Sequence, residues 1–424
     1  MIVRPQAGGR LAFVLPAALV SGEAWGPTRK LIAERYHLET VIASHDAERP
    51  NFSENTDLSE ILFIARKRES GEAPGPTTYI NLWRNPRSIH EALDLAGRIE
   101  KTENPVSVES PGMTTLRTKA NKLGEMVTMP AAKGEENWTG ALFAQTEMLR
   151  TCWRLQEGEL LVPGQPKPVQ IPVCRLDSLG ALGPDQKRIH EGFTVSTDDW
   201  SPYPGFWGHK SEQVTTIRQE TNARLLVWRE SPRGPDYGPH LWERAGRILI
   251  VERLRTNTHR LVAVRFETDI LGNTWWAFKP DSLSKEQEKV LSLWLNASLS
   301  VLLLFGRRVV TQGAWMKLKQ PAWESMPVLD VRALDSNQLN ALAEAYDDLC
   351  GENLEAIAGL AHDPTRKKID EAIARVLKLP DLSPIRELLA REPGLTARDI
   401  NPRATQMNLI EEDEEDGQGR IVLN

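Results

Sequence analysis

The sequence predicts an α/β protein that begins with the end of a doubly wound sheet and continues into a β-rich region and C-terminal helices. Two observations predict the sheet. Short apolar runs such as 11–15 do not alternate with polar residues, and the first 70 residues follow the order strand, helix, strand, loop, strand. The β-rich region is indicated by a change after residue 150, since ten of the 13 tryptophans lie between Trp153 and Trp323.

Bulk composition fits a soluble globular chain. Its 424 residues are enough for two or three domains, and 40% are hydrophobic and 26% charged. No apolar run approaches the ~20 residues of a membrane span, and the N-terminus lacks a signal-peptide pattern, so we expect a cytoplasmic protein without a membrane partner. Cys152, Cys174 and Cys350 are widely spaced without a histidine at ligand spacing, which predicts reduced structural thiols and no metal site.

The net charge of −6 is unevenly distributed. Residues 151–330 carry 23 Lys and Arg against 20 Asp and Glu, whereas 331–424 carry 11 against 19. Six of those acids form the run EEDEED at 411–416, which predicts a disordered acidic tail. The chain is therefore not a globally basic nucleic-acid binder, and any such surface must be local.

The first strand raises the question of its neighbours. A turn at 8–10 precedes the apolar run 11–15, and such a run is typical of a strand buried on both faces. A central strand of this kind needs a neighbour on each side. We expect either that later strands complete the sheet or that the rest of it lies outside this sequence.

The next elements follow in order. Apolar residues at helical spacing predict a helix within 22–37, and the runs 37–45 and 57–68 predict two strands. Because only a loop joins these two strands, they should pair antiparallel. A strand over 79–84 and a helix over 86–101 then close this region.

The stretch GGRLAFVLP, the helix, HLETVIASHD and NFSENTDLSEILFIARK together resemble the second half of the catalytic domain of adenine-N6 DNA methyltransferases. The likeness covers roughly 7–68 and is to the class whose target-recognition domain follows the catalytic domain, as in type I and fused restriction-modification enzymes. In that family an Asn/Asp-Pro-Pro-aromatic motif and a Gly-rich cofactor turn come first. This chain contains neither, and its LGALG at 179–183 is expected to be a loop that precedes no helix start. The resemblance implies S-adenosylmethionine as methyl donor, bound mostly by an upstream half missing from this sequence.

The resemblance also implies a role for one aromatic residue. In related enzymes an aromatic side chain in the loop before the last antiparallel strand stacks on the flipped base, and Phe52 matches that place. The alternative is that Phe52 only packs the loop onto the sheet. Asn51 and Asn55 are weaker candidates.

The middle region alternates apolar strands with arginines. The runs 224–231, 246–255, 259–268 and 274–279 predict strands joined by short turns. Arginine side chains suit phosphates and guanine edges, so base readout is expected between Trp200 and Arg260. The alternative is an ordinary β-rich domain with solvated arginines. The candidate DNA-binding residues of this region are Arg229, Arg233, Arg253 and Arg255.

The stretch 284–330 resembles the end of a target-recognition domain in these methyltransferases and in type I specificity subunits. The matching pieces are a long helix carrying Leu-Asn-Ala-Ser at 295–298, a basic loop at 307–319 and Met-Pro-Val at 326–328. The loop should be exposed and follow a phosphate backbone, because it holds four cations and no acid. Its candidate phosphate contacts are Arg307, Arg308, Lys317 and Lys319.

Helical periodicity predicts two C-terminal helices, over 336–349 and 365–379, the second beginning after Asp363-Pro364. The expected organisation is the end of a catalytic domain at 1–110, a linker at 111–150, a recognition domain at 151–330, a helical spacer at 331–405 and the acidic tail at 406–424.

Taken together, the sequence indicates the distal part of a site-specific adenine-N6 DNA methyltransferase that needs a catalytic half to act. The expected partners are double-stranded DNA, an upstream catalytic half or modification subunit, and an endonuclease. The alternative is a DNA-binding specificity module without chemistry of its own, acting with a separate catalytic subunit. An inactive remnant is a third interpretation.

Overall fold

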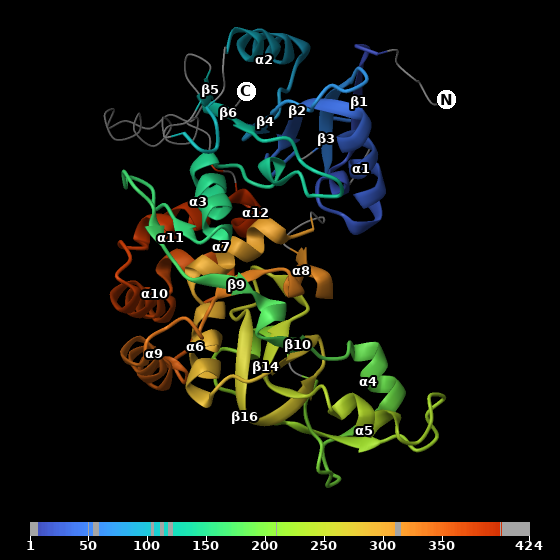
Figure 1. Ribbon diagram of the computed structural model, residues 1–424, viewed down its shortest axis with the longest axis vertical. Coiled ribbons are helices and arrows are strands. Elements are labelled where there is room, and N and C mark those ends of the chain that lie inside the picture. The colour runs from blue at the N-terminus through green and yellow to red at the C-terminus, as the bar shows by residue number, and fades with distance from the viewer. Residues whose placement is uncertain are drawn as a thin grey trace, which may run out of the picture.

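The computed structural model describes residues 7–49, 51–53, 59–102, 106–110, 114–117, 122–208, 210–309, 315–398 and residue 400. The fold is mixed α/β, as the sequence predicts: the N-terminal part forms a six-stranded sheet and the middle forms a seven-stranded sheet. The C-terminal helices α9 and α10 lie beside the middle part, and α11 and α12 lie between the two sheets (Figure 1). The acidic run 411–416 lies outside the described residues.

The first sheet has the strand order β1-β3-β2-β4-β6-β5. Its β2 and β3 pair antiparallel, which confirms the predicted hairpin, and β3 lies between β1 and β2. Since β2 also pairs parallel with β4, the strands β1, β2 and β4 run in the same direction. The elements of this part are β1 Arg10–Pro16, α1 Gly26–Arg35, β2 Tyr36–Ser44, β3 Glu60–Lys67, β4 Thr77–Leu82, α2 Ile89–Lys101, β5 Thr114–Arg117 and β6 Lys122–Met129.

The expectation that the first strand is buried on both faces is wrong for this structure. Among the described residues β1 pairs only with β3 and forms the edge of the sheet. Phe13 is 45% exposed and Val14 41% exposed. The physical reason is that later strands supply a neighbour on one side of β1 only.

The segment 111–150, which the sequence suggested as a linker, contributes to the folded core instead. Its β6 pairs with β4 and with β5, so the first sheet extends to Met129. It also begins α3, Thr146–Gln156, whose buried side packs against α7 and α11. The sequence between 111 and 130 lacks a strong apolar run, which explains why these strands were not predicted.

The second sheet has the order β10-β17-β14-β16-β12-β13-β11 and contains the strands predicted in the middle region. Its strands, with the short helices that accompany them, are β10 Gly180–Leu182, α4 Gln186–Gly192, β11 Phe193–Ser196, β12 Pro204–Phe206, β13 Ala223–Val227, α5 Tyr237–Trp242, β14 Gly246–Val251, β16 Ala263–Gly272 and β17 Trp275–Pro280. Three strand pairs lie outside both large sheets: β15 Arg253–Arg255 with β18 Trp315–Lys317, β9 Val173–Arg175 with β19 Pro327–Leu329, and β7 Glu159–Leu160 with β8 Val169–Gln170.

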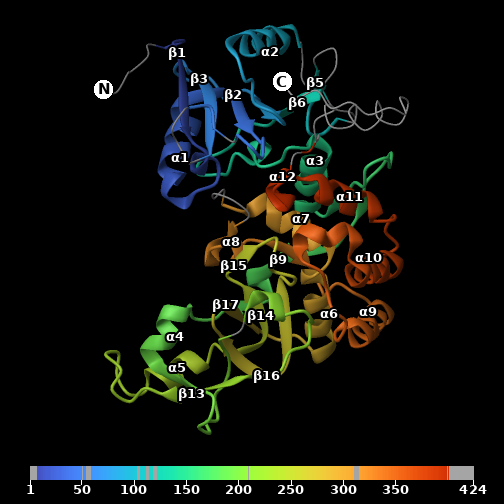
Figure 2. The same cartoon turned by 180° about the vertical axis from the view of Figure 1, so that it is seen from behind.

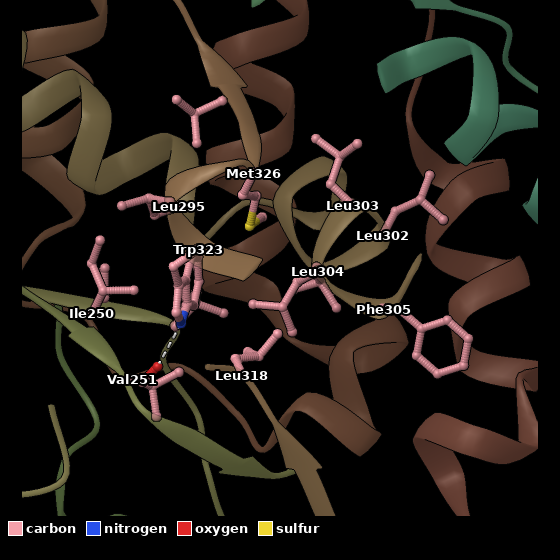
Figure 3. Close-up of a cluster of buried hydrophobic side chains, with 14 of the residues drawn as sticks. Ile250, Val251, Leu295, Leu302, Leu303, Leu304, Phe305, Leu318, Trp323 and Met326 are labelled. Atoms are coloured by element: carbon pink, nitrogen blue, oxygen red, sulfur yellow. Dashed lines mark hydrogen bonds between the residues drawn. The ribbon is translucent and has the colours of Figure 1, made fainter. Parts of the chain in front are cut away.

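The long helix expected after residue 284 is two helices, α6 Lys285–Leu295 and α7 Ser298–Arg307, which meet at a 67° bend. Every residue of α7 from Ser298 to Gly306 is buried. Figure 3 shows its leucines and Phe305 in a cluster with Trp323 of α8, Gln320–Glu324, whose Nε1 donates to the Val251 carbonyl at 2.9 Å. Among the described residues no single helix could span a membrane; only the bent pair reaches the required length and composition.

Residues 295–298 connect the second sheet to the C-terminal helices. Asn296 is fully buried; its Oδ1 accepts from Val262 N at 2.9 Å and its Nδ2 donates to Ala263 O at 2.8 Å, next to β16. Ser298 donates its backbone N–H and its hydroxyl to the Asp370 carboxylate. The motif therefore ties the second sheet to the C-terminal helices, which are α9 Ser336–Leu349, α10 Pro364–Leu377, α11 Ser383–Arg391 and α12 Pro393–Thr396.

The two helices predicted after residue 331 are confirmed as α9 and α10. Asp363 caps α10 as expected, because its carboxylate accepts from Thr365 N and Arg366 N at 3.0 Å each.

Candidate nucleic-acid interface

A cavity of about 190 Å³ lies at the carboxyl ends of β1 and β2. Its walls come from the residues that follow those strands, including His45, and from segments far along the chain, including Arg308, Met316 and Gly394. The strand ends thus face the middle of the molecule rather than solvent (Figure 2). In open α/β sheets this is the edge at which ligands bind.

His45 stands in this cavity as a neutral imidazole. Burial, together with the nearby Arg308 guanidinium, lowers the pKa of His45 to about 4. Asn81 donates its Nδ2 hydrogen to Gly140 O at 2.9 Å, so its Oδ1 faces His45 and accepts from Nε2 at 3.2 Å. Sequence reasoning did not single out His45, although its place at the end of a predicted strand was a signal.

The carboxylates of Asp46 and Glu60, which line the cavity, accept hydrogen bonds from backbone N–H groups. Asp46 accepts from Glu48 N, Arg49 N and Asn85 N, each at 3.0 Å. Glu60 accepts from Phe52 N at 3.0 Å and from Ser53 N at 2.7 Å. These bonds fix the loops after β2 and before β3.

The residues around this cavity do not fit S-adenosylmethionine. The cavity is smaller than the ~300–1,000 Å³ of typical small-molecule sites. The chain after β1 enters the short apolar helix Ala17–Val20 instead of a Gly-rich turn, and Asp46 and Glu60 already hold backbone groups. No step of a methyl transfer is therefore assigned to these residues.

Arg307 and Arg308 do not form the exposed phosphate-binding loop that the sequence suggested. Arg308 is 7% exposed and donates to the carbonyls of Phe305 at 2.8 Å and Leu142 at 2.6 Å. Burial lowers the pKa of Arg307, whose guanidinium donates to Ser325 Oγ at 2.8 Å. Both arginines end the buried helix α7, and so their side chains anchor neighbouring segments.

A basic ribbon is formed where β15 pairs with β18. Arg253 and Arg255 are exposed on one face, whereas Leu254 and Met316 are buried on the other. Lys317 occupies the register position opposite Arg253. The pairing brings together residues more than 60 positions apart that the sequence proposed separately, and Met316 places the ribbon at the wall of the cavity.

Lys319 extends this basic surface toward the first sheet. It is exposed and forms an ion pair with Glu23, which lies in the short helix Glu23–Trp25 after β1. The ion pair connects the N-terminal part to the residue that precedes α8.

Arg229 and Arg233 lie elsewhere, on the turn between β13 and α5 at the far end of the second sheet (Figure 1). Arg229 is exposed, and Arg233 pairs with Glu191 at 3.1 Å. In the same part of the chain Trp200 is 81% exposed, whereas the other tryptophans whose side chains the structure describes are buried or half-buried.

Phe52 lies on the opposite face of the first sheet from the cavity. Its half-buried ring packs against a small core under α2 that contains Ile80, Leu82, Leu95 and Met126. This placement agrees with the packing role, which was the alternative that the sequence left open for Phe52. The stacking role stays a prediction. Asn55 lies outside the described residues.

No model of a known protein family and no curated protein sequence matches the chain. Solved structures with a weak likeness include the type IIG restriction endonuclease BpuSI, with a TM-score of 0.38 and 12% identity over 93% of this chain and 47% of that one. They include the type IIL restriction-modification enzyme MmeI in complex with DNA, with a TM-score of 0.34 and 12% identity over 90% of this chain and 49% of that one. A third is the HsdS subunit from Thermoanaerobacter tengcongensis, with a TM-score of 0.23 and 10% identity over 92% of this chain and 96% of that one. The chain spans about half the length of the first two, and likenesses at this level do not place it in a family.

Proposed function

We propose that this chain is the distal, DNA-binding portion of a site-specific adenine-N6 DNA methyltransferase from a restriction-modification or phage-defence system. The proposal joins the sequence resemblance over 7–68 and 284–330 to the geometry of the basic ribbon. In this function the chain binds duplex DNA, and the methyl donor and catalytic tetrapeptide belong to an upstream half.

The observation that carries the DNA-binding role is the position of the ribbon. Arg253 and Arg255 project from the same face of β15, two residues apart, which is the spacing at which side chains on a strand share a face. Guanidinium groups presented in this way can hold successive phosphates of one strand. The opposite face of the ribbon, through Met316, lines the cavity at the ends of β1 and β2, where an extruded base would need shelter from water.

Duplex DNA binding tests this role directly. The purified chain should bind a labelled duplex of random sequence, with an affinity that falls as salt rises. Replacing Arg253 and Arg255 with Ala should weaken binding and reduce the slope of log affinity against log salt by about 0.9 for each phosphate that is no longer neutralised. The measurement is fluorescence anisotropy across a salt series.

The matched control is Lys367→Ala with Arg375→Ala, which removes two cations from α10 and leaves the ribbon intact. It should leave the salt slope close to the original value. If the ribbon variant keeps both its affinity and its slope while its thermal unfolding is unchanged, the ribbon is ordinary solvated surface and the proposal fails.

The alternative function is a specificity module that binds DNA and works with a separate catalytic subunit. The hydrogen bonds from backbone N–H groups to the carboxylates of Asp46 and Glu60 favour this function, because they give both side chains a structural role. Labelled S-adenosylmethionine separates the two functions. Methyl transfer to DNA by the chain combined with an upstream catalytic half supports a split enzyme, whereas DNA binding without transfer supports the module.

A further inference from the structure

The edge strand β1 is apolar, extended and open. Among the described residues its ladder partners all belong to β3, from Arg66 opposite Arg10 to Glu60 opposite Pro16, and no described strand pairs with its other edge. An open edge presents a row of backbone donors and acceptors that can pair with another strand.

Both faces of β1 are also exposed. Phe13 and Val14 are successive residues and point to opposite faces of the sheet, and each is more than 40% exposed. Phe13 shares its face with Phe63, at a ring-centroid separation of 6.0 Å. The sequence of this strand is typical of burial on both faces, yet the described residues cover neither face fully and leave one edge open.

The apolar surface continues from β1 across the neighbouring strands. Val14 lies opposite Leu62 in the ladder, and Leu62 in turn lies opposite Ile42 of β2, so the three side chains share one face. Leu62 and Ile42 are only half-buried, whereas Ile80 and Met126 farther along that face are buried under α2. The helix α2 therefore covers only one half of this face, and the described residues cover the half that includes β1 incompletely.

Between Arg10 and Pro16, the described edge lacks the charges, prolines and bulges that keep free strands apart in soluble proteins. Residues 11–15 contain no charged side chain, and the ladder with β3 runs from Arg10 to Pro16 without a register shift. Natural edges are usually protected by charges, bulges or a covering segment. An unprotected edge of this kind indicates an interface.

We propose that the open edge and outer face of β1 form a docking surface for a separate α/β polypeptide, which adds a strand to β1 and lays an apolar helix over Val14, Leu62 and Ile42. The surface requires both elements, because the edge needs backbone partners and the face needs apolar cover. The choice of partner rests on the proposed function, whereas the surface itself does not.

A second copy of this chain would not satisfy the surface. Antiparallel pairing of two β1 strands places the two-fold axis perpendicular to the sheet, so both outer faces would lie on the same side of the joined sheet. Each copy would gain a strand partner and still leave Val14, Leu62 and Ile42 in water. A partner that brings its own helix buries all three.

The test uses the full chain and, as probe, the purified product of the reading frame immediately upstream. Sedimentation velocity should show this chain as a monomer and the mixture as a one-to-one complex. Val14→Lys should weaken the complex at least about tenfold, because it would bury an unpaired charge. Deuterium exchange at residues 11–15 should slow when the complex forms.

The matched control is Leu93→Lys, which introduces the same charge at a 65% exposed site on α2. It should leave the affinity unchanged. Absence of a complex, a complex insensitive to Val14→Lys, or a dimer of this chain that Val14→Lys abolishes would each overturn the proposal. None of these measurements involves DNA, so their failure is separate from failure of the DNA-binding role.

Discussion

Two apolar runs of similar composition differ sharply in how far they are buried in this molecule. The run SVLLLF in α7 is buried on every side, whereas the run LAFVL in β1 is exposed on both faces. The difference does not come from the residues themselves. It comes from their neighbours, because α7 is enclosed by α3, α6, α11 and the cluster around Trp323 (Figure 3). Among the described residues, β1 has one strand beside it.

The comparison shows that an apolar run predicts that a segment needs to be buried. It does not predict whether this chain provides the residues that bury it. Burying apolar surface contributes roughly 25 cal/mol for each Å² removed from water. The middle and C-terminal parts satisfy that requirement internally. The described part of the first sheet leaves β1 and the outer face at Leu62 and Ile42 incompletely buried, which is why we assign their cover to another polypeptide.

The largest expected effect separates the two runs by a matched pair of substitutions. Phe305 is fully buried, 5.3 Å from the ring of Phe143 and beneath the Arg308 guanidinium. Phe305→Ala should lower the free energy of unfolding by about 3–5 kcal/mol, because it leaves a cavity. Phe13→Ala should lower it by about 1 kcal/mol or less, because the ring is 45% exposed.

Urea unfolding of both variants checks this difference. Equal losses of stability would mean that β1 is already buried in the isolated chain, for instance by self-association, and would remove the contrast between the two runs. Repeating the Phe13→Ala measurement in the presence of a docking partner should raise its cost toward that of Phe305→Ala.

The sequence predicted much of the fold because period and turn signals are local. The hairpin of β2 and β3, the strands of the second sheet and the helices α9 and α10 all follow from apolar spacing within a few residues. The strands β5 and β6 were missed because their stability comes from pairing with β4, which lies about 45 positions earlier in the chain than β6. The bend between α6 and α7 depends on Asn296 bonding to the backbone of residues 262 and 263.

The candidate site was predicted less well, because charge alone does not specify exposure. Arg307 and Arg308 resemble a basic loop in the sequence, yet they end a buried helix and their guanidinium groups bind a hydroxyl and carbonyls. Arg253 and Lys317 were proposed for different reasons, and only the register of β15 with β18 places them opposite each other. Such a pairing joins distant parts of the chain, and local patterns do not reveal it.

A second prediction concerns Glu392, which connects the segment before α12 to the segment before α3. Glu392, just before α12, is fully buried; it accepts from Ala144 N at 3.0 Å and from Gln145 Nε2 at 3.2 Å, just before α3. Burial raises the pKa of Glu392 to about 7, from a reference value of 4.5. The folded protein therefore keeps a proton that the unfolded chain loses between these pH values.

The stabilising contribution of this proton is complete below about pH 4.5 and is lost as pH rises to about 7. Glu392→Gln cannot ionise, so its free energy of unfolding relative to the unmodified chain should rise by about 3 kcal/mol across that window. Urea unfolding of both proteins at several pH values measures this difference. His45 has the opposite pKa shift, but it is present in both proteins and cancels. A difference that stays constant with pH would show that folding does not raise the pKa of Glu392.

The smallest expected effect concerns Phe52, where packing and base stacking remain to be separated. Its half-buried ring contacts the small core under α2, so Phe52→Ala should cost less stability than Phe305→Ala. If Phe52 also stacks on a flipped base, the variant combined with a catalytic half should methylate DNA about tenfold to a hundredfold more slowly, since such stacking contributes roughly 1–3 kcal/mol. Its DNA affinity should change much less, because the proposed phosphate-binding side chains are elsewhere.

Phe52→Leu keeps apolar volume in the core but removes the flat ring, and it should therefore restore stability without restoring the rate. A full rate in both variants would make Phe52 a packing residue and would place any base-stacking group outside this chain or on another of its loops.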